Sequence, residues 1–266
     1  DPRTLGKWIT AFASLYGLVT IGLGIYWSQT PDPFDVRQSA AQYAALTEQE
    51  VVTGSVTVAA LQETIRTLLE KPGGYLHNDV FPPGVWLDNT PHWEYGVLVQ
   101  SRDLARALRE VLSRSQSQSK EDVDLTLAEP RINFQSDSWI LPASESEYRD
   151  AGRFLERYRS RLALTGENSA QFYARADNLS HWLSMIEKRL GSLSQRLSAS
   201  VGQRRINTDL AGDTAAAQST NAPDEILVRT PWREIDDIFY ESRGAAWALT
   251  QFLKAAEIDF ADVLAK

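Results

Sequence analysis

The sequence predicts a mainly α-helical protein, with one amino-terminal transmembrane helix followed by a helical bundle. Three observations predict this class. A stretch of 20 uncharged residues lies near the amino terminus, at 8–27. Several later stretches repeat apolar residues every three or four positions. Few segments show the alternation of strands. With 266 residues, 43% of them hydrophobic, the chain is also long enough to bury a core of its own.

The opening stretch, WITAFASLYGLVTIGLGIYW at 8–27, is long enough to cross a bilayer, because a helix of that length extends about 30 Å. Trp8 closes one end, and Tyr26 and Trp27 close the other, as expected for aromatic belts at two membrane interfaces. The run is too long for the apolar region of a signal peptide, and no small-x-small cleavage motif follows it. We therefore predict a retained membrane anchor.

The charges on either side of this helix predict its orientation. Arg3 and Lys7 precede it, whereas Asp32 and Asp35 follow it. The positive-inside rule then places the stub 1–7 in the cytoplasm and all later residues outside it. Because the chain begins without a methionine, we expect further sequence before it.

The overall composition excludes some classes of partner and site. The net charge of -8 argues against a nucleic-acid interface, because phosphates are bound by basic patches. The absence of cysteine excludes disulfides and thiolate metal sites. Small residues on one face of the membrane helix predict close approach of another helix, and so a second membrane protein as partner beside the lipid bilayer. This stripe consists of Ala13, Gly17, Thr20 and Gly24.

The first part of the outer domain is predicted to contain short helices. A proline-bearing spacer, 28–57, leads into a region at 58–143 whose first helical stripe stops at Pro72 and the glycines after it. A second helical stripe follows at 101–114. The segments DLTL and INF, at 124–127 and 132–134, have the composition of short strands.

The strongest periodic signal lies at 144–206, where a capping box begins a heptad pattern. Polar residues and Gly166 weaken its centre, so the segment is either one long helix or a helical hairpin. The register continues across the weak centre, which favours one helix. Arg196 is expected on its solvated face. The seam of its second half is predicted to contain Leu179, Leu183, Ile186, Leu190 and Leu193.

The end of the chain is predicted to return to the bundle. Residues 207–230 are small and polar and predict a flexible linker. Thr230 and Pro231 then suit the start of a helix. This carboxy-terminal helix, within 231–266, has a face of small and apolar residues at 235–256. We expect that face to pack on the long helix in an antiparallel bundle.

The stretch at 73–96, GGYLHNDVFPPGVWLDNTPHWEYG, poses the main functional question. A metal site built from His77, Asp79, His92 and Glu94 is one interpretation, because residues two apart on a strand share a face. This pattern lacks the fixed helical spacing of known zinc motifs. A hydrolase that uses Glu94 or Asp79 as general base is another, although no nucleophile or second carboxylate has a diagnostic spacing.

A structural interpretation explains more of the same stretch. The Phe-Pro-Pro-Gly sequence fixes backbone angles and favours a turn. Aromatic rings supply large apolar contact areas, which either pack helices together or dock a partner. We therefore predict a rigid aromatic loop that needs no cofactor, with its histidines hydrogen-bonded. The proposed docking residues are Tyr75, Phe81, Trp86, Trp93 and Tyr95.

Three segments together resemble a known family: WSQTPDPFDV after the membrane span, KPGGYLHNDVFPPGVWLDNTPHWEYGVL, and RDLARALR. The chain resembles the bacterial family called domain of unknown function 2333. This resemblance implies a Gram-negative inner-membrane protein and carries no catalytic residues across.

The functional hypothesis is a single-pass protein of the inner membrane with a periplasmic carboxy-terminal domain. It would act as a non-catalytic interaction or scaffold subunit of an inner-membrane complex. A metal-dependent envelope hydrolase built on the loop is the alternative. A sensor that signals through the long helix is a third, although no cytoplasmic output domain is visible.

Overall fold

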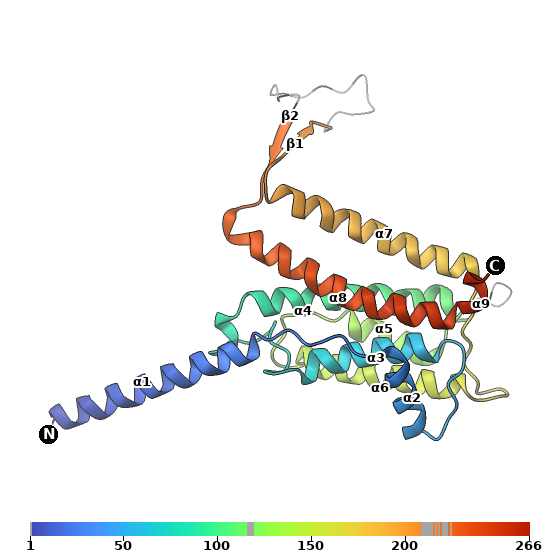
Figure 1. The fold of residues 1–266 in the computed structure, drawn as a ribbon, viewed down its shortest axis with the longest axis horizontal. Coiled ribbons are helices and arrows are strands. Elements are labelled where there is room, and N and C mark those ends of the chain that lie inside the picture. The colour runs from blue at the N-terminus through green and yellow to red at the C-terminus, as the bar shows by residue number, and fades with distance from the viewer. Residues whose placement is uncertain are drawn as a thin grey trace.

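The computed structural model describes residues 2–115, 120–208 and 225–266, together with 215, 217, 219 and 223. Within these residues the predicted mainly helical class, with few short strands, is confirmed (Figure 1). The longer helices are α1 (Pro2–Trp27), α2 (Val36–Leu46), α3 (Ser55–Glu70), α4 (Asn89–Ala107), α5 (Val123–Ile132), α6 (Ser144–Leu162), α7 (Ala176–Ala199) and α8 (Ile235–Asp259). The shorter elements are η1 (Gly84–Trp86), the π-helical turn η2 (Leu108–Leu112), η3 (Trp232–Glu234), α9 (Ala261–Leu264) and the paired strands β1 (Gln203–Ile206) and β2 (Glu225–Val228).

Helix α1 extends away from the bundle, and the other long helices lie side by side (Figure 1). The apolar stretch of α1, Arg3–Trp27, is long and apolar enough to cross a membrane, and only 11% of its most apolar window is buried. An isolated helix in water would not keep so many large apolar side chains exposed. The helix therefore has the length and the surface of a membrane span, which a signal sequence shares.

The core is organised around the pair α4 and α8. The two helices approach closely because each has a glycine at the crossing: a Cβ on Gly96 would lie 2.0 Å from the carbonyl oxygen of Glu241, and a Cβ on Gly244 would lie 2.0 Å from that of Trp93. Helices α3 and α5 pack against this pair, α6 packs on α3 and α5, and α2 packs on α3. The end of α8 also caps α3, because Asp259 accepts hydrogen bonds from the backbone N–H groups of Gly54 and Thr57 at 2.8 and 2.7 Å.

The prediction of one continuous helix over 144–206 is wrong. The helical pattern divides into α6 and α7, and residues 163–175 connect them without helix. The carbonyl of Arg161 accepts the N–H of Ala170, and the carbonyl of Leu112 accepts the N–H of Tyr173, at 2.9 and 2.7 Å. These bonds hold the connection against the bundle. The two helices do not form a hairpin, because α6 packs on α3 and α5 whereas α7 packs on α8 and α4.

The predicted leucine seam of α7 is also wrong in part. Leu179, Ile186 and Leu193 are buried, but Leu183 and Leu190 are 40% and 44% exposed. The buried face is rotated toward Trp182, and beside it two arginines, whose side chains stay 44% and 42% exposed, pair with other helices. Arg189 donates to Asp103 of α4 at 2.8 and 2.9 Å, and Arg196, expected to be solvated, pairs with Glu241 of α8. Apolar spacing could not show this face, because the paired arginines lie beside its apolar side chains.

Three smaller predictions need correction. The spacer 28–57 contains helix α2, which begins after Asp35, whose carboxylate caps it through the backbone N–H groups of Arg37 and Gln38. The segments predicted as short strands, 124–127 and 132–134, instead lie in or just after α5. Strands form at β1 and β2, which pair antiparallel and project from the bundle beside α7 (Figure 1). Most of the predicted linker 207–230 lies outside the described residues, but its last part contains β2 and is not an unstructured linker.

Candidate functional site

The stretch at 73–96 lies where α1 meets the bundle (Figure 1). Its first part is irregular, η1 follows, and α4 begins at Asn89. Asp88 supplies the N-cap of α4 through a hydrogen bond from the N–H of Asn89, at 2.8 Å. The last residues of the stretch are therefore helical, so His92 and Glu94 are not on a strand and do not share a face as the metal hypothesis requires.

Glu94 is the centre of the loop. Its carboxylate is fully buried and accepts the backbone N–H groups of Leu76, at 2.9 Å, and of His77, at 2.7 Å. The ammonium group of Lys71, also buried, lies 2.5 Å from its Oε1 and donates to the carbonyl of Gly74 at 2.5 Å. One carboxylate thus holds both ends of the turn after α3 against α4.

Burial raises the pKa of Glu94 to about 7, although Lys71 and the two backbone donors oppose this shift. A carboxyl group with such a pKa has the proton affinity of a general base. Both of its oxygens, however, are already engaged by an ammonium group and by backbone N–H groups. No solvent reaches them, so Glu94 is a structural group and not a base available to a substrate.

The other three candidate ligands have separate partners. The Nδ1 of His77 lies 3.0 Å from the carbonyl oxygen of Pro91, and its ring stacks on Tyr95. Burial lowers the pKa of His77. The Nε2 of His92 lies 3.2 Å from Oδ1 of Asp237 in α8, and Asp79 lies against Gly84. The four predicted ligands are thus turned to four different neighbours.

The described residues contain one close group of three acidic side chains, which is a different set. Asp88, Asp236 and Asp237 have carboxylate oxygens within 4.8 Å of one another. Each has a local explanation: Asp88 caps α4, and the other two lie in the first turn of α8, where the helix dipole favours negative charge. Exposed acidic groups of this kind do not define a metal site.

The aromatic residues of the loop divide into buried and exposed sets. Trp93 is buried and meets Trp247 of α8 edge to face at 5.3 Å. Tyr75 is buried against Tyr148 of α6, and its hydroxyl donates to a backbone carbonyl at 3.0 Å. Phe81 and Trp86, by contrast, are 69% and 61% exposed. The buried set joins helices, whereas the exposed set is available to a partner.

The loop also covers one face of α1. Pro83 and Leu87 lie next to Gly24, where an added Cβ would be 3.7 and 3.8 Å from them. Thr20 is buried as well, with 3% exposure. Two members of the predicted small-residue stripe are thus covered by residues of the same chain. The positions nearer the amino terminus, Ala13 and Gly17, are not buried.

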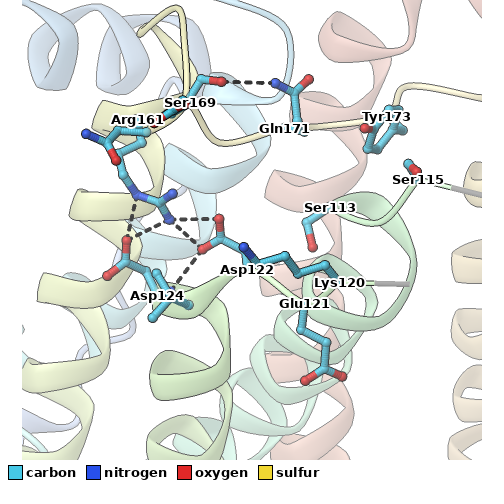
Figure 2. A pocket seen from close by; sticks show the side chains of 13 residues that line it. Ser113, Ser115, Lys120, Glu121, Asp122, Asp124, Arg161, Ser169, Gln171 and Tyr173 are labelled. Atoms are coloured by element: carbon cyan, nitrogen blue, oxygen red, sulfur yellow. Dashed lines mark hydrogen bonds and ion pairs between the residues drawn. The ribbon is translucent and has the colours of Figure 1, made fainter. Parts of the chain in front are cut away.

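A polar hollow of about 540 Å³ lies elsewhere, between the start of α5, the end of α6 and the connection to α7 (Figure 2). Its central cation, Arg161, donates to Asp122 at 2.5 and 2.7 Å and to Asp124 at 2.8 Å. The same Asp122 caps α5. The chain's three histidines lie outside the described lining of this hollow. Arg161 and the two aspartates are therefore paired with one another, which explains their position at the junction of α5 and α6.

Sequence reasoning missed Lys71, the partner that makes Glu94 structural. The two residues are 23 positions apart, and a single lysine at the end of a helix gives no signal of burial. The only indication was the position of Glu94 between Trp93 and Tyr95, both large rings. A charge inside an aromatic run on a helix must either be exposed or have a buried partner.

Together these features define a class: a helical bundle joined to an amino-terminal apolar helix of membrane-spanning length, with a loop beside the joint that a buried ion pair holds in place. The chain belongs to the family described as "Uncharacterized protein conserved in bacteria (DUF2333)", whose model matches residues 3–266. No curated protein and no solved structure matches the chain.

Proposed function

We propose that this protein is a single-pass membrane protein whose outer bundle is an interaction or scaffold unit of an inner-membrane complex. The observation that carries the proposal is the contrast between α1 and the bundle. The large apolar side chains of α1 are exposed, whereas those of the bundle form a continuous buried core. A hydrophobic helix attached to a separately closed domain is the design of an anchor.

The charges flanking α1 support a cytoplasmic amino terminus. Arg3 and Lys7 lie before the apolar stretch and acidic residues after it, the distribution that the positive-inside rule associates with export of the following domain. In this topology the bundle is periplasmic.

The surface around α7 and the β-hairpin supports a role in interaction. Val201, Ile206 and Leu227 are 87%, 77% and 64% exposed. A two-stranded hairpin is only marginally stable by itself, and exposed apolar strands are a ready interface for another chain. Together with exposed Leu183 and Leu190 on α7, these side chains suit a protein partner within the same membrane.

The hydrolase alternative receives less support. Glu94 has no free oxygen for a substrate, and the other three loop candidates face separate neighbours. An accessory protein of a membrane complex needs no catalytic group, so the scaffold role agrees better with the described site.

Two experiments test the proposal in native membranes. A reporter that is active only after export, fused behind Lys266, should be active, and activity of a cytoplasm-specific reporter there would refute the topology. A photo-crosslinking residue at Ile206 should give a discrete protein adduct, whereas one at Arg153, exposed on α6, should not. Absence of an adduct at Ile206, at Leu183 and at Val201 would refute the interaction role.

A further inference from the structure

The loop beside α1 contacts that helix at a level that the proposed topology places inside the membrane. The covered positions are Thr20, Gly24 and Trp27, and a Cβ on Gly73 would lie 2.7 Å from the ring of Trp27. Thr20 lies seven residues before Trp27, so the covered face extends about 10 Å along the helix. A soluble loop would end at the membrane surface, whereas this one continues beside the last two turns of the span.

The outward side of the same loop is apolar and uncharged. The segment VFPPGVWL at 80–87 contains no charge, and neither does SWILPAS at 138–144. Phe81 and Trp139 meet edge to face at 6.3 Å, which joins the two segments into one surface. The surface is well exposed: Trp86 is 61% and Leu141 is 90% accessible. An exposed apolar surface of this kind is typical of a site that contacts a membrane or another protein.

We propose that this surface is a membrane-interface collar, which inserts into the outer leaflet around the end of α1. The collar consists of Val80, Phe81, Val85, Trp86 and residues 139–141. The inference rests on the proposed membrane anchoring of α1. Its partner is the lipid bilayer itself, and its consequence is that the bundle is held against the membrane at a fixed angle.

Three arguments favour lipid over a second protein. The collar adjoins α1 at interface depth, so any protein partner would have to displace lipid that is already there. Tryptophan is enriched at membrane interfaces, where an apolar ring meets polar headgroups, and the collar adds Trp86 and Trp139 to Tyr26 and Trp27 of α1. The covered face of α1 is about 10 Å long, which is comparable to the roughly 5–10 Å to which interfacial helices bury their apolar faces.

The net charge of the bundle predicts how insertion of the collar depends on salt. The charged residues within 1–27 are Asp1, Arg3 and Lys7, which give a net charge of +1. Because the whole chain has a net charge of -8, residues 28–266 have a net charge of -9. Anionic lipid repels a domain of this charge. The collar must therefore enter the membrane by apolar burial alone, and its insertion should not weaken when salt is raised.

The absence of cysteine allows a direct measurement on the full chain. Single cysteines at Val85 and Leu141 report on the collar, one at Val19 on the exposed face of α1, and one at Val201 on the distant hairpin. All four positions are exposed. Each variant carries an environment-sensitive fluorophore in phosphatidylcholine vesicles, with and without lipid that bears a doxyl quencher on the acyl chain close to the headgroup.

We expect labels at Val85 and Leu141 to lose as much fluorescence as the label at Val19, at low and at high salt, and the label at Val201 to lose none. Quenching at Val19 without quenching at Val85 and Leu141 would overturn the collar and leave the anchor intact. Absence of quenching at Val19 would overturn the anchor as well. Quenching at the collar that disappears in high salt, or equal quenching at Val201, would also overturn the proposal.

Discussion

Replacement of Lys71 by methionine should destabilise the helical bundle strongly at alkaline pH. Lys71 is buried, and its ammonium group lies 2.5 Å from the fully buried carboxylate of Glu94. The variant keeps most of the side-chain volume but leaves that carboxylate with backbone donors alone. Removing one member of a buried ion pair typically costs about 3–5 kcal/mol, because the remaining charge is uncompensated.

The cost should decrease with falling pH. Burial raises the pKa of Glu94 to about 7, and Lys71 opposes the shift, so its loss raises the pKa further. In the wild type the folded pKa already lies above the ordinary value of 4.5. The contribution of Glu94 to stability is therefore fully present below about pH 4.5 and is lost as pH rises to about 7. In the variant the carboxyl is protonated at about pH 5, and no charge is left unpaired.

Heat denaturation of the full chain in mild detergent, followed by circular dichroism, tests this. We expect the Tm of Lys71→Met to fall by about 10 °C at about pH 8 and by clearly less at about pH 5. Arg153→Met is the control, because Arg153 pairs with Asp150 at 2.6 Å on the exposed surface, where such pairs contribute less than about 0.5 kcal/mol. A Lys71→Met variant no less stable than this control, or equally destabilised at both pH values, would refute the reasoning.

The remaining predictions concern helix packing. Gly244→Ala should cost at least about 1–3 kcal/mol, because the new Cβ would lie 2.0 Å from a carbonyl oxygen of α4; an unchanged Tm would contradict this. Ile186→Ala should cost about 2–5 kcal/mol and Leu183→Ala less than about 1 kcal/mol, because only the first is buried; equal losses would favour the heptad seam. Gly73→Ala and Gly74→Ala share positive φ values of 86° and 71°, but only the first reaches the ring on α1. The distribution of distances between spin labels on α1 and α6 should broaden for Gly73→Ala alone. If it broadens in both variants, backbone strain and not the lost contact with α1 causes the change.

The parts of the fold that the sequence predicted are those with a one-dimensional signal. The uncharged run at 8–27 and the stripes of α3 and α8 are local patterns. The break between α6 and α7 was missed because the heptad register continues across residues 163–175 by coincidence. The connection there is held by hydrogen bonds to Arg161 and Leu112, and Leu112 is more than 60 positions away from its partner in sequence.

The candidate site shows the same limit more sharply. The composition of the loop predicted aromatic packing or docking, and the rings of Tyr75 and Trp93 are buried. It could not separate them from Phe81 and Trp86, which are exposed. That division depends on which residues face α6 and α8 and which lie beside α1. Sequence spacing carries no such information when the neighbours come from four different elements.

The loop also explains how α1 can fix the orientation of the bundle. Residues 28–35, which contain no regular element beyond one turn position, would by themselves let the bundle swivel about the end of α1. The loop supplies a second connection: Glu94 holds the backbone of Leu76 and His77, and Pro83 and Leu87 of the same loop lie next to Gly24, three residues before the end of α1. Two connections at different points of α1 restrict rotation as one cannot. In the proposed topology, the hairpin and the exposed face of α7 are then presented at a defined distance from the membrane, which a partner anchored in the same bilayer requires.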